Sequence, residues 1–535
     1  MDEHVAQPLP LSRVAERTAA PRRERGARPA RPLNAGSALV AAPINRVRYR
    51  AALVDLNNFS TFPTLAIGIL VASLRNAGFD AEVLCPLAYD VPAAEREHRE
   101  TWLDHWQRRI HLSTAPAFRW GRDAARAARA AWRERPHPLV LREVARVLDG
   151  RPDVVLLSAY LQHYETVVKV GRLAAQRGIP LLLGGPVFNM PGTADAWRGV
   201  PGLTGIVGGE VDWVLPQIVE TAITRGDLLA FDGVTLPDGR HSREMPPLRD
   251  LDAVPVPDFT DFPWDRYRFR VIPLMAGRGC QWARCTFCSD VRSASGRTYR
   301  TRSVESVLHE MREQSRRHQT QNFLFLDIKL NSYPHLLRGL AEHAQRVVPG
   351  AQWVGTVHVD SRKDNGLSRH ELRALVAAGM RRVSFGLESG SQRMLDLMDK
   401  GCSVEANAQF IREAHAAGLS VRCTMFKGFP GETADDLAAT ARFLREHGRF
   451  IDRVRCNDFS IYEATPVYEQ VLNPPGTFPQ IRIVALDERR GRVRYVNVDT
   501  GSAAYRRAKA EVLEAVFTIN RRPIRSSARA FDGLM

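Results

Sequence analysis

Short apolar runs that alternate with helix-period segments constrain the fold of this chain more than any other feature of its 535 residues. The N-terminal half contains five strand-like runs, at residues 49–56, 81–87, 153–160, 179–185 and 205–210. Helix-like segments lie between and after them, among them residues 64–76, 167–178 and 211–226. Strands that alternate with helices imply right-handed crossovers and a parallel sheet. We therefore predict an α/β protein with a doubly wound parallel sheet over residues 46–225.

The same alternation begins again in the second half of the chain. Six further strand candidates are residues 274–280, 322–328, 353–359, 381–389, 421–428 and 453–462. Six β/α units indicate an open, partial (β/α)6 barrel of TIM type over residues 266–480, with its chemistry at the carboxyl ends of the strands. Ser368 and Thr433 are the expected N-caps of two of its helices.

The remaining segments are interpreted from their composition. Residues 1–45 hold many Arg and Pro but few large apolar residues, which predicts a disordered tail. Turn signals and prolines predict a linker at 226–265, and residues 481–535 predict a hairpin followed by one helix that begins at Ser502. An insert at about residues 90–135 is expected to be helical. This insert and the C-terminal segment are the candidates to close the barrel and shape a substrate pocket.

The formal charge of +16 does not indicate a nucleic-acid ligand. Only six of the 75 basic residues are lysines, and a genome rich in G and C produces such an arginine excess without an anionic partner. No stripe that combines basic and aromatic residues is present in the sequence. The sequence also lacks a run of 18 apolar residues and a secretory leader. We therefore expect a cytoplasmic protein that uses neither a membrane nor nucleic acid.

Three cysteines within nine residues decide the chemistry that we predict. The segment GRGCQWARCTFCSD spaces Cys280, Cys285 and Cys288 as C-x4-C-x2-C directly after the first barrel strand. Thiolates on one short loop select iron–sulfur, zinc or copper(I). A structural zinc site normally has four protein ligands, whereas three leave one coordination position open. We favour an iron–sulfur cluster and keep a zinc-stabilised, non-enzymatic binding protein as the alternative from another class.

The chain resembles the radical S-adenosylmethionine (SAM) superfamily, whose usual motif is C-x3-C-x2-C with an aromatic residue before the last cysteine. This sequence departs from that motif by one extra residue in the first gap. The resemblance implies a [4Fe-4S] cluster on the three thiolates, with SAM on the fourth iron. It also implies an electron donor such as flavodoxin or ferredoxin. The positions that match the family's SAM-binding motifs are Phe287, Asp327, Glu388, Ser389, Gly428 and Gly431. Each has a structural alternative: Asp327 as a loop cap, Glu388 as an ion-pair partner, and the GFPGE segment as a turn.

The layout over residues 48–475 resembles that of the cobalamin-dependent members of this superfamily. That resemblance implies that the N-terminal, Rossmann-like domain holds cobalamin over the barrel mouth. The residues that it assigns to cobalamin are Ser158, Tyr160, Gly184, Gly185, Pro186, Gly208, Gly209 and Glu210. The D-x-H-x-x-G signature that supplies a cobalt ligand is missing, because Asp55-Leu56-Asn57-Asn58-Phe59-Ser60 follows the first strand. Cobalt would then lack a histidine from that loop.

The resemblance implies a C-methyltransferase that acts on an unactivated carbon of a small molecule, in specialised metabolism such as antibiotic biosynthesis. A radical SAM cyclase or rearrangement enzyme with the same domains shares every motif and is the main alternative. A tRNA methylthiotransferase would need three cluster cysteines in the front domain, where only Cys85 is present. Cys402, Cys423 and Cys456 are expected to be ordinary buried residues.

Overall fold

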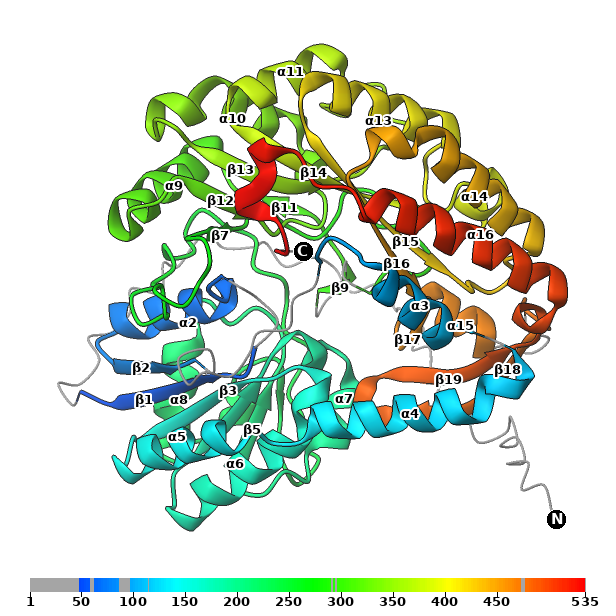
Figure 1. The fold of residues 1–535 in the computed structure, drawn as a ribbon. Coiled ribbons are helices and arrows are strands. Elements are labelled where there is room, and N and C mark those ends of the chain that lie inside the picture. The colour runs from blue at the N-terminus through cyan, green and yellow to red at the C-terminus, as the bar shows by residue number, and fades with distance from the viewer. Residues whose placement is uncertain are drawn as a thin grey trace, which may run out of the picture.

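The computed structural model describes residues 48–57, 62–85, 97–113, 115–289, 292–293, 296–472 and 477–534. These residues form two α/β domains, with the second curving over the first (Figure 1). The predicted N-terminal tail lies outside the described residues. None of the helices in the described ranges is long and apolar enough to cross a membrane.

The front domain is built on a six-stranded sheet with the order β2-β1-β3-β4-β5-β6. Its strands are β1 (Arg50–Asp55), β2 (Asp80–Leu84), β3 (Val154–Ser158), β4 (Leu181–Gly184), β5 (Leu203–Val207) and β6 (Val234–Thr235). The first five are parallel, as predicted, and β6 is an antiparallel edge strand. The sequence did not reveal β6, because it has only two residues and belongs to the turn-rich segment predicted as a linker.

Helices cover both faces of this sheet, so the doubly wound fold is confirmed. One face packs against α2 (Leu65–Asn76) and α8 (Leu215–Ile223), and the other against α5 (Pro138–Asp149), α6 (Tyr164–Gln176) and α7 (Pro191–Trp197). Burial on both faces explains why the strands are continuously apolar. Two prolines close to its start, at 136 and 138, kept α5 from being recognised in the sequence.

The second domain contains the predicted six parallel strands, in the order β16-β15-β14-β13-β12-β7. They are β7 (Ile272–Leu274), β12 (Asn322–Phe325), β13 (Gln352–Val357), β14 (Met380–Glu388), β15 (Ser420–Lys427) and β16 (Arg453–Asp458). The first predicted strand, 274–280, is in fact divided: β7 ends at Leu274, and β8 (Gly277–Arg278) leaves the sheet to pair with β11 (Arg300–Thr301). A second short pair joins β9 (Arg292–Ser293) to β10 (Gly296–Arg297).

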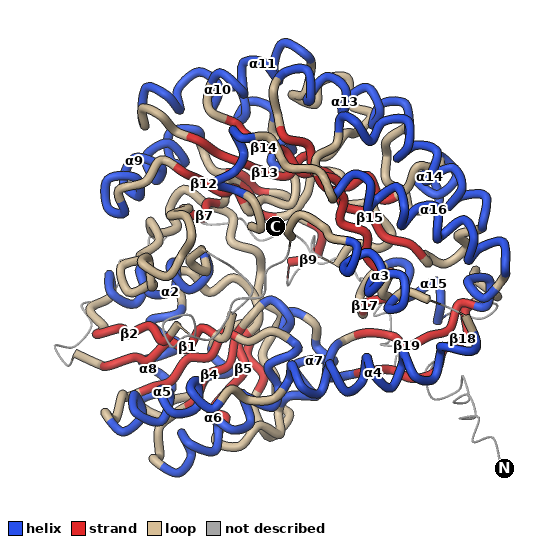
Figure 2. The backbone as a smooth tube through the Cα atoms, viewed as in Figure 1, coloured by secondary structure: helices blue, strands red, loops and turns tan. Residues whose placement is uncertain are grey.

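An outer layer of helices surrounds these strands (Figure 2). It comprises α9 (Val304–His318), α10 (Pro334–Val347), α11 (Arg369–Ala377), α13 (Val404–Ala417), α14 (Ala434–His447) and α16 (Ala503–Asn520), while the short α12 (Gln392–Leu397) follows β14. The hydroxyls of Ser368 and Thr433 each accept a backbone N–H in the first turn, so both predicted N-caps are confirmed. The helix predicted to begin at Ser502 is α16, and the Ser502 hydroxyl caps it in the same way.

The insert and the C-terminal segment close the open side of the barrel, next to the edge strand β16. The insert forms α3 (Trp102–His111), which packs on α16, and α4 (Pro116–Glu134). The C-terminal segment forms the predicted hairpin, β18 (Ile481–Asp487) with β19 (Arg492–Asn497), which β17 (Ile461–Tyr462) extends next to α15 (Pro466–Leu472). An ion pair between Arg490 and Glu134 joins the hairpin to α4.

Candidate active site

The loop with the three cysteines begins where β8 ends, at the carboxyl side of the barrel. Gly279 has φ +85, and a Cβ at this position would lie 1.8 Å from the carbonyl oxygen of Thr298. The strand pair β8–β11 therefore holds the start of the loop so closely that only glycine is accommodated there.

Contacts with α12 and α15 fix the rest of this loop. The Trp282 indole N–H donates to the carbonyl oxygen of Asp399 at 2.7 Å, and the Thr286 amide donates to the carbonyl oxygen of Met398 at 2.9 Å. The amide of Val467, in α15, in turn donates to the carbonyl oxygen of Thr286 at 2.9 Å. Segments more than 100 residues apart thus anchor the cysteine loop at the barrel mouth.

The thiols are partly shielded from solvent and lie near a lysine. Cys280 is buried, Cys285 and Cys288 are half-buried, and none of the seven cysteines, all of which are described, forms a disulfide. Burial raises the pKa of the Cys285 thiol, while the cation of Lys400 opposes that increase. Lys400 therefore stabilises negative charge at this sulfur, as a thiolate ligand requires.

The donor set of this loop bears on the choice between an iron–sulfur cluster and a zinc site. In the described part of the chain, no three His, Cys, Asp or Glu side chains are placed to hold a metal ion together. An iron–sulfur cluster takes its thiolates on separate irons, so the three sulfurs need not meet at one point. Three thiols on one anchored loop beside a lysine suit such a cluster.

Lys400 also forms an ion pair with Glu388, a predicted SAM contact. The ammonium lies 3.0 Å from the Glu388 carboxylate and 5.5 Å from the centre of the Phe287 ring, and both charged side chains are about 90% buried. Glu388 has φ +57 at the irregular end of β14. Phe287 in addition contacts Phe426 of β15, with ring centres 5.0 Å apart. Three of the positions predicted from the sequence thus surround Lys400: Cys285, Phe287 and Glu388.

Asp327 contacts the backbone of the segment that leads into the cysteine loop. Its carboxylate oxygens accept the backbone N–H groups of Ala276 and Gly277 at 3.0 and 2.7 Å. Burial raises the pKa of this carboxyl to about 7. In this arrangement Asp327 acts as a cap for the chain between β7 and β8, which is the structural alternative weighed above.

The other predicted SAM positions follow β14 and β15. Ser389 is buried, and its hydroxyl lies 3.2 Å from that of Thr440 in α14. Gly428 and Gly431 have φ +81 and +83, and the Gly428 amide donates to the Glu432 carboxylate at 2.6 Å. The GFPGE segment is therefore a tight turn that Glu432 stabilises, at the same barrel edge as the cysteine loop.

Four polar residues at this edge were not recognised in the sequence. Lys329 and Asp360 form a buried ion pair, and Arg362 Nε lies 2.9 Å from the same carboxylate. His358 is buried nearby with its ring centre 6.3 Å from that of Trp282, and burial lowers its pKa to about 2. The available signal for His358, Asp360 and Arg362 was the segment HVDSR, in which polar residues follow the buried strand β13, whereas Lys329 follows β12.

The predicted cobalamin positions gather at the carboxyl edge of the front sheet. Ser158 and Gly184 are neighbours at the ends of β3 and β4. A Cβ on Gly184 would meet only the carbonyl oxygen of Val207, at 3.5 Å, so this edge has open space. Gly185 approaches β3 closely, and Pro186 begins the turn after β4. The Tyr160 amide donates to His163 Nδ1 at 3.2 Å.

The positions after β5 include the contact between the two domains. Gly208 packs against the backbone of Phe188, and the Gly209 amide donates to Asn189 at 2.6 Å. Glu210 accepts two hydrogen bonds from Arg300, at 2.6 and 2.9 Å. Among the predicted cobalamin positions after β5, Glu210 thus contacts the barrel domain.

Asp212 adds a second interdomain ion pair next to the first. Its two carboxylate oxygens accept hydrogen bonds from Arg278 at 2.8 and 2.7 Å. Arg278 lies two residues before Cys280, and Arg300 lies on the paired strand β11. The carboxyl edge of the front sheet is therefore connected directly to the base of the cysteine loop.

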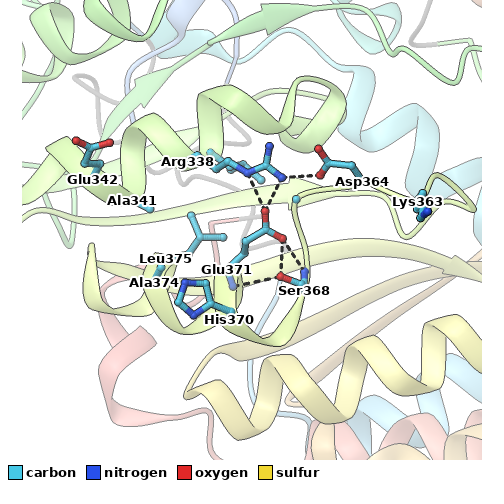
Figure 3. Close-up of a pocket in the computed structure, with 12 residues that line it drawn as sticks. Arg338, Ala341, Glu342, Lys363, Asp364, Ser368, His370, Glu371, Ala374 and Leu375 are labelled. Carbon is cyan, nitrogen blue, oxygen red and sulfur yellow. Dashed lines mark hydrogen bonds and ion pairs between the residues drawn. The ribbon is translucent and has the colours of Figure 1, made fainter.

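A surface pocket of about 630 Å³ lies elsewhere, between α10 and α11 (Figure 3). Arg338 crosses it and contacts Asp364 at 2.6 Å and Glu371 at 2.7 Å. This pocket is in the outer helical layer, and none of the predicted cofactor residues lines it. It is not part of the candidate site.

Comparisons with known proteins agree with this geometry. The sequence profile of the radical SAM superfamily matches residues 274–444. A protein of Pyrococcus horikoshii named as an uncharacterized methyltransferase is 23% identical over 343 residues, which are 62% of this chain and 72% of that protein. The anaerobic magnesium-protoporphyrin IX monomethyl ester cyclase of Rubrivivax gelatinosus is 27% identical over 260 residues. That match spans 46% of this chain and 45% of the cyclase.

Two solved structures share the two-domain architecture. The radical SAM methyltransferase TsrM from Kitasatospora setae, with cobalamin and a [4Fe-4S] cluster bound, superimposes with a TM-score of 0.57 at 16% identity, covering 82% of this chain and 81% of TsrM. The cobalamin-dependent SAM radical enzyme OxsB gives 0.61 at 16% identity, covering 85% and 65%. Residues 274–444 therefore match the radical SAM superfamily, and the fold of the chain is that of the solved cobalamin-dependent members.

Proposed function

We propose that this protein is a cobalamin-dependent radical SAM C-methyltransferase acting on an unactivated carbon of a small molecule in specialised metabolism. The observation that carries the proposal is the pair of ion pairs Glu210–Arg300 and Asp212–Arg278. They hold the carboxyl edge of the front sheet against the base of the cysteine loop. In open α/β sheets with the order 2-1-3-4-5, ligands bind at that edge.

The cofactors would provide the difficult chemistry. When bound, the [4Fe-4S] cluster supplies the electron that cleaves SAM to methionine and a 5′-deoxyadenosyl radical, and cobalamin supplies the methyl group for the substrate radical. Cys280, Cys285 and Cys288 would hold the cluster, and a protein such as flavodoxin or ferredoxin would deliver the electron. The chain itself positions the reactants and excludes water.

Several described residues suit those two tasks. Lys400 offsets negative charge at Cys285, and the contact between the rings of Phe287 and Phe426 places apolar surface beside the cysteine loop. Asp327 keeps the base of the cysteine loop in place through two backbone amides. The SAM contacts predicted at Glu388, Ser389, Gly428 and Gly431 stay predictions, as do the cobalamin contacts.

A second candidate function is a cyclisation or rearrangement by the same domains. The cyclase of Rubrivivax gelatinosus is 27% identical over 260 residues, which supports this alternative. The names of the Pyrococcus horikoshii relative and of TsrM favour methyl transfer. Both reactions begin with the same cleavage of SAM, so their products distinguish them.

The decisive experiment uses the full chain, reconstituted anaerobically with iron, sulfide and hydroxocobalamin and then incubated with SAM, reductant and candidate substrates. We expect 5′-deoxyadenosine and S-adenosylhomocysteine together, and a substrate heavier by one methylene unit. Deoxyadenosine alone, with a product of unchanged carbon count, would favour the cyclase. If preparations that contain iron and sulfide release neither deoxyadenosine nor S-adenosylhomocysteine, both the methyltransferase and the cyclase are rejected. Cys288→Ser is the negative control, and Cys402→Ser is the matched positive control.

Cobalamin binding can be tested without turnover. Gly184→Val fills the open space at the ends of β3 and β4, so we expect it to lose hydroxocobalamin while its thermal unfolding changes little. Gly199→Val, at an exposed glycine with no atoms within 4 Å of a new Cβ, should bind cobalamin like the wild type. Equal corrin absorbance in both variants after gel filtration would contradict the proposed position.

A further inference from the structure

Four arginines line the interior of the barrel on three adjacent strands. Arg382 of β14, Arg422 of β15, and Arg453 and Arg455 of β16 occupy alternate positions along these strands. The residues between them belong to the core under the helices: Val383, Phe385, Val421, Cys423, Val454 and Cys456. Because side chains alternate between the two faces of a strand, the four arginines face the lumen.

Acidic side chains neutralise only part of this charge. Glu97, from the segment before α3, lies 2.9 Å from Arg382 and 3.4 Å from Arg422. Asp532, near the C-terminus, lies 4.0 Å from Arg453. In the described ranges these two carboxylates are the ones within 4.0 Å of the four guanidinium groups, and Asp452 acts on Arg453 from a longer distance. Burial lowers the pKa of Arg422 to about 10, and its neighbours Arg382 and Arg455 act in the same direction.

Arg455 differs from the other three. It makes no side-chain hydrogen bond or ion pair with any residue that the structure describes, and it is exposed although it faces the barrel interior. The strand register pairs Arg422 with Arg453, Thr424 with Arg455, and Phe426 with Asn457. Arg455 thus lies two residues nearer the carboxyl end of the strands, and so nearer the barrel mouth, than the paired residues Arg422 and Arg453.

The next row connects Arg455 to the reaction centre. Asn457 is also exposed, and its partner Phe426 contacts Phe287 of the cysteine loop. Two residues of a strand span about 7 Å, so Arg455 lies roughly that distance below the row that touches this loop. A molecule anchored at Arg455 could extend upward to the cysteine loop.

We propose that Arg455 binds an anionic group of the substrate, a carboxylate or a phosphate, inside the barrel lumen. The inference rests on the proposed function, because it takes the molecule in the lumen to be the substrate. A guanidinium group offers paired N–H donors that match two oxygens of either anion. The uncompensated charge around Arg422 and Arg453 adds a favourable field for the anion. The reacting carbon would then lie on the side of the substrate away from its anion.

The test measures anion binding to the full chain with its cluster reconstituted, in the absence of SAM and reductant. Isothermal titration calorimetry with inorganic phosphate and with benzoate distinguishes the two anions, and benzamide is the neutral probe. Arg455→Gln removes the charge, and Arg455→Lys keeps it without the paired donors. Arg482→Gln is the matched control, because Arg482 is another exposed strand arginine but lies on the hairpin.

We expect phosphate or benzoate to bind the wild type and Arg482→Gln equally, and benzamide not to bind. Arg455→Gln should weaken the anion by about tenfold or more, and Arg455→Lys by about threefold. If Arg455→Gln does not fold, Arg455→Lys decides, and wild-type affinity in that variant would overturn the proposal. Failure of both anions to bind the wild type, or equal weakening in Arg482→Gln, would also overturn it.

The same preparations separate this inference from the proposed function. Anion binding needs neither SAM nor an electron, whereas release of deoxyadenosine and S-adenosylhomocysteine needs both. A chain that releases these products but binds no anion at Arg455 would refute only the inference. A chain that binds the anion but never cleaves SAM would refute the proposed function.

Discussion

The interdomain ion pair Asp212–Arg278 gives the most specific stability prediction. Asp212→Asn keeps the size of the side chain but removes its charge, and it replaces one of the two oxygens that accept from Arg278. The side chains of Asp212 and Arg278 are only 7% and 17% exposed. The variant therefore leaves a mostly buried guanidinium group with only part of its compensation.

The size of the effect follows from these contacts. Removing one partner of a buried ion pair costs about 3–5 kcal/mol. Arg278 retains some contact with solvent and keeps Glu210 at 3.3 Å, which reduces the loss. We expect Asp212→Asn to lower the free energy of unfolding by about 2–3 kcal/mol. The matched control Asp238→Asn breaks an exposed pair with Arg240 and should change the free energy of unfolding far less, because solvent screens that pair.

Urea unfolding followed by tryptophan emission measures this difference. Trp213, which is next to Asp212 and 47% exposed, contributes to the signal. Because a chain with two domains need not unfold in one step, the midpoint of each transition is compared with that of the control. Iron retention should fall in the same variant, since Arg278 precedes Cys280 by two residues. Identical midpoints in Asp212→Asn and Asp238→Asn would refute this account of the interface.

Three further predictions concern the cysteine loop and the barrel. We expect iron and sulfide to be lost after reconstitution in each of three variants: Cys280→Ser, Cys285→Ser and Cys288→Ser. The control Cys402→Ser, at a buried cysteine outside the loop, should retain both. Wild-type iron content in any of the first three variants would exclude that cysteine as a ligand. Lys400→Met leaves the Glu388 carboxylate buried and unpaired, so it should destabilise the fold by about 3 kcal/mol, and adding Glu388→Gln should restore part of that loss in urea unfolding. If the double variant is no more stable than Lys400→Met, the ion pair is not the cause. Burial raises the pKa of Glu432 from its ordinary 4.5 to about 7, so the folded chain holds a proton that the unfolded chain has already released. The stability that this group contributes is complete below about pH 4.5 and is lost as the pH rises through 7. Glu432→Gln should therefore reduce the fall of the urea midpoint between pH 5 and 8. If the midpoint of this variant falls as steeply as that of the wild type, the raised pKa of Glu432 is contradicted.

The sequence alone determined the features that depend on neighbouring residues. Apolar runs that alternate with helical periods predicted both parallel sheets, and the hydroxyls of Ser368 and Thr433 were recognised as N-caps. The spacing of the three cysteines indicated the metal chemistry, because a short loop limits how far apart its thiols can lie. Such signals are local, since burial period and capping are set within a few residues.

Only the tertiary structure decided which polar side chains meet. The carboxylate of Asp327 caps backbone amides about 50 residues earlier, Lys400 pairs with Glu388, and Glu97 enters the lumen to meet Arg382, 285 residues away. The edge strand β6 was missed because it has only two residues in a turn-rich segment, and α5 was missed because two prolines lie close to its start. A side chain's partner across the fold depends on how sheets and helices pack, and no local pattern in the chain records that.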